Sequence, residues 1–122
     1  GPTTSTRMDI FEDEFIKNFK VRVVIGKGGM GKKTTDAMAK YGAVYGAFTG
    51  GAAILAAKAI KNVKSAEWLD LGTPEALWIF EVEDFGPLAV AIDSHGNNIF
   101  MDVAKKVEEN KQKIYQKLGL LP

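Results

Sequence analysis

Val21-Arg22-Val23-Val24-Ile25-Gly26-Lys27-Gly28-Gly29-Met30-Gly31-Lys32 is the stretch that says most about the fold. The β-branched run at 21–25 predicts a strand that ends at Gly26, and the glycines after it predict a tight loop. A helix is expected at 33–41. Strand, glycine loop and helix in this order are typical of α/β proteins, where the free backbone N–H groups at a helix start can hold an anion.

The elements on either side extend this pattern. Met8, Phe11, Phe15 and Phe19 recur at helical spacing, so a helix is expected there with Glu12, Asp13 and Glu14 facing solvent. Further strands are expected at 43–49, 65–71, 77–83 and 88–93, the last followed by a turn and a return at 98–101. An apolar helix, buried on several sides, is expected at 52–60, and a helix at 102–118 with an apolar face formed by Val103, Val107, Ile114 and Leu118 and a solvated lysine face. Residues 1–122 are therefore predicted to form one α/β domain with a mixed sheet.

Composition excludes several classes of function. The chain has 122 residues, a net charge of +1 and no cysteine, so it offers no thiol nucleophile, disulfide or thiolate ligand for a metal. The balanced charge gives no strong attraction to nucleic acid or anionic membranes. The longest apolar stretch, 50–57, is far shorter than the ~20 residues of a membrane span, and no signal peptide is visible. A cytoplasmic location is expected.

The first nine residues form a second candidate anion site. Thr3, Thr4 and Arg7 stand where a helix is expected to begin, and the Arg guanidinium matches the planar geometry of a carboxylate or phosphate. Lys27, on the glycine loop, supplies another cation. A functional motif at the very start of the sequence suggests that the chain is trimmed at its N-terminus.

The glycine loop resembles a nucleotide-binding P-loop, and this is an alternative interpretation. Such a loop needs Ser or Thr directly after its second Lys to bind Mg²⁺. Here Lys33 stands at that position and Thr34 follows one residue late, which rotates the hydroxyl by about 100° on a helix. The preferred interpretation is that the glycines shape a loop on which Lys27 binds an anion. A third interpretation is that the glycines only form a tight turn. The single histidine, His95, is expected to be a turn residue within 93–97.

Five motifs in register point to a known family: Gly1-Pro2-Thr3-Thr4-Ser5-Thr6-Arg7-Met8-Asp9, Ile25-Gly26-Lys27-Gly28, Gly50-Gly51-Ala52-Ala53, Leu71-Gly72-Thr73-Pro74-Glu75-Ala76-Leu77-Trp78 and Val82-Glu83-Asp84-Phe85. Over nearly its whole length up to about Phe100, the chain resembles the β subunit, or C-terminal domain, of class I fumarases and L-tartrate dehydratases. These are oxygen-sensitive iron–sulfur hydro-lyases. The resemblance implies a swivelling three-layer β/β/α domain with a mixed sheet. Family members also carry an upstream segment, with a further Arg and His in the site, that has no counterpart here.

The resemblance also implies a reaction and its residues. The reaction would be the reversible hydration of fumarate to (S)-malate, or alternatively the conversion of L-tartrate to oxaloacetate, to which the stretches 85–88 and 94–98 look closer. A four-iron four-sulfur cluster would act as Lewis acid, and a cysteine-bearing α subunit would ligate it, since this chain has no cysteine. Arg7 and Lys27 would be the clamps for substrate carboxylates. Thr3 would be the catalytic hydroxyl and base, with Thr4 beside it; simple helix capping by these threonines is the alternative.

Overall fold

The β-branched run after the first helix forms the strand on which the fold is built, as its composition predicts. The computed structural model describes residues 4–48, 51 and 53–120. Along the chain the elements are η1 (Ser5–Met8), α1 (Glu12–Phe19), β1 (Val23–Gly26), α2 (Lys32–Tyr41), β2 (Val44–Ala47), α3 (Ala53–Ala59), β3 (Ile60–Glu67), η3 (Leu69–Leu71), β4 (Leu77–Val82), β5 (Ala89–Ile92) and α4 (Ile99–Lys117). Both η elements are short 3₁₀ helices.

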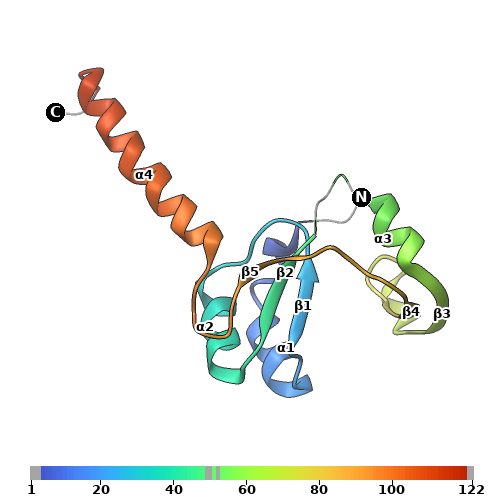
Figure 1. The fold of residues 1–122 in the computed structure, drawn as a ribbon. Coiled ribbons are helices and arrows are strands. Elements are labelled where there is room, and N and C mark those ends of the chain that lie inside the picture. Colours follow the sequence, from blue (N-terminus) through green and yellow to red (C-terminus); the bar gives the residue numbers. More distant parts are fainter. Residues whose placement is uncertain (1–3, 49–50, 52, 121–122) are drawn as a thin grey trace.

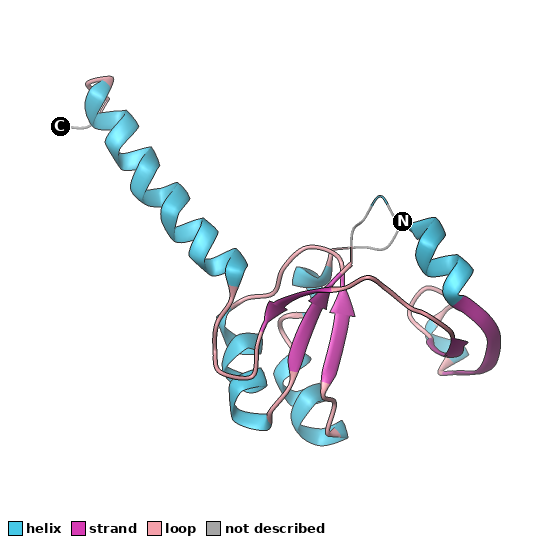
Figure 2. Ribbon diagram, in the orientation of Figure 1, coloured by secondary structure: helices cyan, strands magenta, loops and turns pink. Residues whose placement is uncertain are grey.

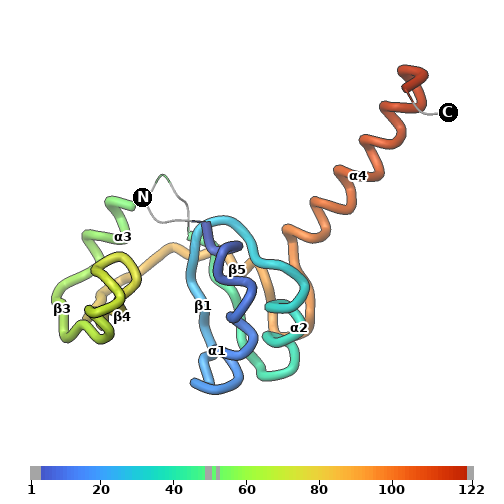
Figure 3. The backbone as a smooth tube through the Cα atoms, turned by 180° about the vertical axis from the view of Figure 1, so that it is seen from behind, coloured from blue at the N-terminus to red at the C-terminus, as the bar shows by residue number. Residues whose placement is uncertain are grey.

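The main sheet is mixed, which confirms the predicted α/β class. Its strand order is β1-β2-β5. β1 and β2 run parallel, with Val23 opposite Val44 and Gly26 opposite Ala47, whereas β2 and β5 are antiparallel. α1 and α2 pack against each other on one face of this sheet (Figures 1 and 3). The parallel pair places the C-terminal end of β1, with the glycine loop, at one edge of the sheet.

A second, smaller sheet consists of β3 and β4, which pair as antiparallel neighbours from Ile60 opposite Val82 to Glu67 opposite Leu77. Figure 2 shows these strands, with α3, beside the main sheet rather than within it. The predicted strand at 77–83 is confirmed as β4. The strand expected at 65–71 is wrong in its bounds, because Trp68 adopts a left-handed conformation (φ 59°) that ends β3 and starts η3.

The core lies between the main sheet and the helix pair. Its fully buried members come from α1, α2, β2 and β5, and they include Ile16, Met38, Tyr45 and Ile92. Met30 from the glycine loop joins them. The loop is therefore anchored to the core at one of its own residues.

The expected orientation of α1 is wrong. Ile16 is the residue that α1 buries against the core, and Glu12, one turn before it, is only 7% exposed, whereas Phe11 and Phe19 are 44% and 64% exposed. Helical spacing shows that the phenylalanines share a face, but not which face a neighbour covers. Here α2 covers the face of Glu12 and Ile16.

The buried Glu12 makes stability depend on pH. Burial, and then the negative charge of Asp9, raises the pKa of the Glu12 carboxyl. The folded chain therefore gains stability below the unfolded-state pKa, and loses it as pH rises through the folded-state pKa. We expect Glu12→Gln to raise the midpoint of thermal unfolding at pH 7 and to change it little near pH 3.5. A variant that is less stable than the wild type at pH 7 would contradict this.

Two further predictions about helices are corrected. α3 is not buried on several sides, because Ile54 is 70% exposed and, of the described α3 residues, only Ala59 is buried. The return expected at 98–101 is the start of α4, since the Asn98 side chain accepts hydrogen bonds from the backbone N–H groups of Phe100 and Met101 and caps that helix. α4 extends away from the sheets (Figures 1 and 3), and its predicted apolar face is exposed. In the parts of the chain that can be described, no helix combines the length and apolar character of a membrane span.

Candidate active site

The N-terminal segment lies directly on the glycine loop. Thr4 and Lys27 form a parallel β-bridge, and the Ser5 backbone N–H donates to the Lys27 carbonyl oxygen at 2.8 Å. The Thr6 hydroxyl donates to the Gly29 carbonyl oxygen at 2.9 Å. The structure therefore brings together the two segments that the sequence suggested as anion sites, although about twenty residues separate them.

Two glycines make this close approach possible. A Cβ atom on Gly26 would lie 1.9 Å from Ser5 Oγ, which is far inside any permitted contact. Gly28 has a left-handed φ of 76°, and a Cβ there would lie 2.7 Å from Thr4 Cγ2. Gly26 is thus required by the neighbouring chain segment, and Gly28 both by that segment and by its own turn.

A carboxylate of the chain occupies the N-terminal end of α2. Asp9 Oδ1 accepts a hydrogen bond from the Gly31 backbone N–H at 3.1 Å and a short one from the Thr34 hydroxyl. A negative group is stabilised there by the positive end of the helix dipole. This is the position in which a P-loop would hold phosphate, and Lys32 instead pairs with Asp36 at 2.6 Å. The nucleotide-binding alternative is therefore wrong.

The two predicted carboxylate clamps differ in their surroundings. Lys27 is half-buried, and none of the described carboxylates lies within 4.0 Å of its ammonium. It lines a cavity of about 350 Å³ whose other walls are mainly apolar and include Ile25, Phe48, Phe80 and Phe85. A positive charge beside apolar walls attracts an anion more strongly than one in open water.

Arg7 opens on a different cavity, of about 360 Å³, lined also by Trp68 and Leu77. Its guanidinium lies 3.7 Å from a carboxylate oxygen of Glu75, and both side chains are more than half exposed. Such a pair contributes little to stability and is easily exchanged for another anion. The structure places the residues just before Arg7 on the Lys27 loop, but it does not place both cations in one cavity.

Only one of the two predicted threonines lies within the described residues. Thr3 lies outside the described residues. Thr4 is exposed, and its side chain makes no capping hydrogen bond to η1, so capping by Thr4 is wrong. The catalytic role of Thr3, with Thr4 beside it, stays a prediction, as do the roles of Arg7 and Lys27.

The sequence of the chain is similar to those of known proteins over most of its length. A sequence profile for the family described as Fumarase C-terminus matches residues 1–103. This chain belongs to that family. The chain is 43% identical over 118 residues to an Escherichia coli (strain K12) protein named L(+)-tartrate dehydratase subunit beta. The match covers 97% of the chain and 59% of that relative.

Two other relatives carry names of a dehydratase subunit and of a hydratase. It is 50% identical over 121 residues to a putative L(+)-tartrate dehydratase subunit beta of Methanocaldococcus jannaschii, covering 98% of the chain and 60% of the relative. It is 40% identical over 119 residues to a putative fumarate hydratase class I of Geobacillus stearothermophilus, covering 94% of the chain and 23% of the relative. The chain thus spans about three fifths of the length of the relatives named as tartrate dehydratase subunits.

His95 is a turn residue, as predicted. Its side chain is exposed, and its backbone N–H donates to Asp93 Oδ1 at 2.9 Å. Hydrogen bonds from Asn97 and His95 to the Asp93 carboxyl hold the turn together. The same bonds lower the pKa of that carboxyl. Gly96 lies against Ala39, near the end of α2 that is remote from the glycine loop.

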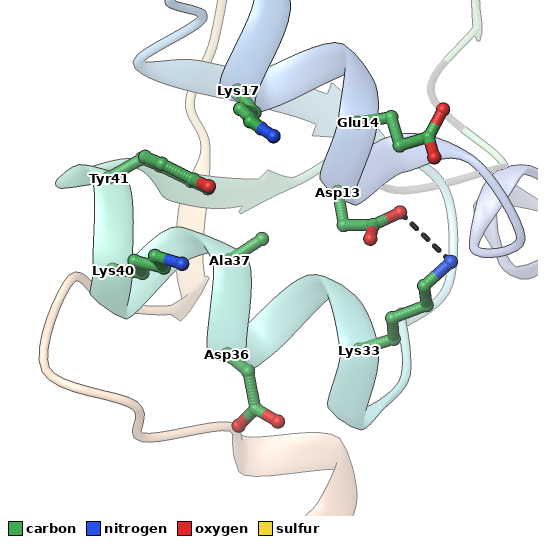
Figure 4. Close-up of a pocket in the computed structure, with 8 residues that line it drawn as sticks. All are labelled: Asp13, Glu14, Lys17, Lys33, Asp36, Ala37, Lys40 and Tyr41. Carbon is green, nitrogen blue, oxygen red and sulfur yellow. Dashed lines mark ion pairs between the residues drawn. The ribbon is translucent and has the colours of Figure 1, made fainter.

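A groove between α1 and α2 is a weaker candidate. Figure 4 shows acidic and basic side chains around it, among them Asp13 and Lys33, whose ion pair spans 3.1 Å. Lys33 also donates to the Ile10 carbonyl oxygen at 3.1 Å. Because three acidic and three basic side chains line this groove, it offers no net charge for recognising a charged substrate.

The residues of this chain do not fit the role of cluster ligands. The sequence has no cysteine, and the described residues contain no group of three or more His, Asp or Glu side chains that could hold a metal ion. Sequence reasoning missed Asp9 as the anion at α2 and Tyr45 as a partner of the glycine loop. Asp9 stands in the quoted N-terminal motif, whereas no local signal marks Tyr45.

Proposed function

We propose that this chain is the β subunit of an iron–sulfur hydro-lyase that acts on a four-carbon dicarboxylate. The observation that carries the proposal is the docking of the Thr4–Arg7 segment on the Lys27 loop, which brings the segment that carries the predicted hydroxyl beside the loop that carries the Lys27 ammonium. The two candidate reactions are hydration of fumarate to (S)-malate and conversion of L-tartrate to oxaloacetate. Relatives that match nearly the whole chain include proteins named for L-tartrate dehydratase and one named for fumarate hydratase, so both reactions stay candidates. A cytoplasmic location is part of the same proposal.

The side chains of this chain would serve the step that is hardest for such a substrate. Removing a proton from the carbon next to a carboxylate builds negative charge on that carboxylate. The Lys27 ammonium, on a loop fixed by backbone hydrogen bonds, would stabilise this charge without reorganising. Arg7, which lines a separate cavity and pairs with Glu75, would have to turn toward the loop to hold the substrate's other carboxylate. Thr3, with Thr4 beside it, would act as the base in its alkoxide form, which nearby positive charge favours and which becomes the neutral hydroxyl when it accepts the proton.

The remaining chemistry would come from a partner. A four-iron four-sulfur cluster, when bound by the thiolates of an α subunit, supplies a Lewis acid for the hydroxyl that leaves. The relatives' names as beta subunits support the existence of such a partner. The chain described here would then contribute binding and charge stabilisation, and the α subunit the metal.

The proposal is tested by anaerobic co-expression with a cysteine-bearing α partner. The purified, cluster-loaded complex is assayed with fumarate, (S)-malate and L-tartrate in separate reactions. Turnover of fumarate and (S)-malate, or of L-tartrate, supports the function and selects the substrate. A cluster-loaded complex that turns over none of the three would overturn it.

Replacing Lys27 tests the charge at the loop. We expect Lys27→Met to lower kcat/KM by at least about 100-fold, the loss typical of removing one donor that stabilises developing charge. Lys32→Met is the matched control, because Lys32 is exposed and pairs with Asp36, and it should stay within about threefold of the wild type. Turnover of the Lys27 variant within a few-fold of the wild type would show that the ammonium is no clamp.

A further inference from the structure

A buried phenol lies where the two segments of the candidate site meet. Tyr45, in β2, is 0% exposed. Its Oη lies 2.9 Å from the Gly28 carbonyl oxygen, to which it donates, and 3.2 Å from Ser5 Oγ. It therefore contacts both the glycine loop and the N-terminal segment.

The residues that Tyr45 contacts are sequence neighbours of the predicted site residues. Gly28 directly follows Lys27, and Ser5 directly follows Thr4. A change in either contact shifts the backbone from which a site side chain projects. Tyr45 itself does not line the Lys27 cavity, so it acts through these neighbours.

The strand that carries Tyr45 is the most firmly held in the sheet. β2 is central and pairs with β1 on one side and β5 on the other. Tyr45 is opposite Val24 in β1 and Ile92 in β5. Its ring belongs to the buried core, so the position of its hydroxyl is fixed by packing.

We propose that Tyr45 is a positioning residue that holds the Lys27 loop and the Thr4–Arg7 segment at a fixed separation. The inference rests on the proposed hydro-lyase function. Burial raises the pKa of the Tyr45 phenol, which keeps the proton needed for the bond to Gly28 throughout the neutral range. The phenol thus has the charge state and the geometry of a permanent tie between the segments.

Tyr45→Phe removes the hydroxyl and leaves the ring in the core. In the cluster-loaded complex we expect kcat to fall about tenfold or more, with KM changed by less than about threefold, because near-attack geometry and not substrate affinity is lost. Rates are divided by cluster content so that unfolded protein does not lower kcat. Tyr41→Phe is the control, since Tyr41 is also packed against the core but makes no side-chain hydrogen bond among the described residues, and it should leave kcat unchanged.

A double substitution tests whether the loss passes through Ser5. If Tyr45 and Ser5 act through the same contact, the Tyr45→Phe/Ser5→Ala complex loses no more kcat than the more impaired single variant. Losses that multiply would show two independent effects and overturn the common tie.

Hydrogen exchange of the same complex gives a readout that needs no turnover. The Ser5 amide donates to the Lys27 carbonyl oxygen at 2.8 Å, and the Val44 amide to the Arg22 carbonyl oxygen at 2.9 Å. We expect Tyr45→Phe to speed exchange at Ser5 at least about fivefold and to leave Val44 unchanged. Unchanged exchange at Ser5, or faster exchange with an unchanged kcat, would overturn the positioning role. A wild-type complex without activity would overturn the proposed function instead, and the exchange rates would still decide whether Tyr45 ties the segments.

Discussion

Gly26→Ala should reduce turnover by the assembled enzyme at least about 100-fold while the chain stays folded. The added methyl would lie 1.9 Å from Ser5 Oγ and 3.1 Å from Ser5 Cβ, so the Ser5 hydroxyl must turn away and the Ser5 backbone must also give to relieve the Cβ contact. That movement breaks the Ser5–Lys27 backbone bond and shifts Thr4 and Arg7 relative to Lys27. A misplacement of about 1 Å in a catalytic group can cost a factor of about 100 in rate. Gly26 does not have a left-handed φ, so the strand itself accepts alanine.

The control for Gly26→Ala is the same substitution on the neighbouring strand. Gly46→Ala places its methyl 3.4 Å from Leu88, an acceptable contact, and should change turnover less than about threefold. Adding Ser5→Gly removes the atom that collides, so the Gly26→Ala/Ser5→Gly complex should recover the activity of Ser5→Gly alone. Circular dichroism and cluster content confirm that each complex is assembled. A Gly26→Ala enzyme with turnover near that of the wild type would show that the docking is not needed.

Replacing Asn98 should cause the largest loss of stability among single changes in the loop region. Asn98 is 3% exposed, and its amide donates to the Met30 carbonyl oxygen at 2.9 Å and to Thr35 Oγ1 at 2.8 Å, while its oxygen caps α4. Asn98→Ala removes the cap and leaves buried acceptors without partners, which together cost about 3 kcal/mol. For a chain of this size, that lowers the midpoint of thermal unfolding by about 12 °C or more.

One further variant separates the roles of the Asn98 amide, and a second serves as its control. Asn98→Asp keeps the acceptor that caps α4 but cannot donate to Met30 or Thr35, and it places a negative charge beside the Met30 carbonyl oxygen, so it tests the buried side of Asn98 with the cap kept. We expect it to be destabilised as well, by about half as much or more at neutral pH. Asn110→Ala, at an exposed position in the middle of α4, should change the midpoint by no more than a few degrees. Equal stability of Asn98→Ala and Asn110→Ala would contradict the role assigned to Asn98.

The local parts of the fold could be predicted because their causes are local. The β-branched residues before Gly26 and the glycines after it produce β1 and the loop, and the Asp93 to Asn97 turn follows from side-chain bonds to adjacent backbone. The mixed sheet followed from the order of helices and strands. The docking of Thr4 on Lys27 and the position of Asp9 depend on contacts between residues more than twenty positions apart, for which spacing gives no rule.

The apolar faces show a second limit. The spacing of Phe11, Phe15 and Phe19 correctly places them on one side of α1, and that of Val103 and Val107 does the same for α4. Periodicity identifies a face but not its cover, and in the described chain both faces stay exposed. α1 instead buries a shorter stripe, Glu12 and Ile16, that includes a carboxyl group and that no hydrophobicity pattern would select.

The carboxylate of Asp9 also bears on how glycine-rich patterns are matched across proteomes. A search for a strand, a glycine loop, a lysine and a helix would return this chain as a false positive for nucleotide binding. The residue that distinguishes this chain from a nucleotide-binding P-loop is Asp9, which lies 22 residues before Gly31 and therefore outside the stretch that such a pattern covers. A filter that asks whether the chain carries its own counter-ion for the helix would remove such cases without reference to function.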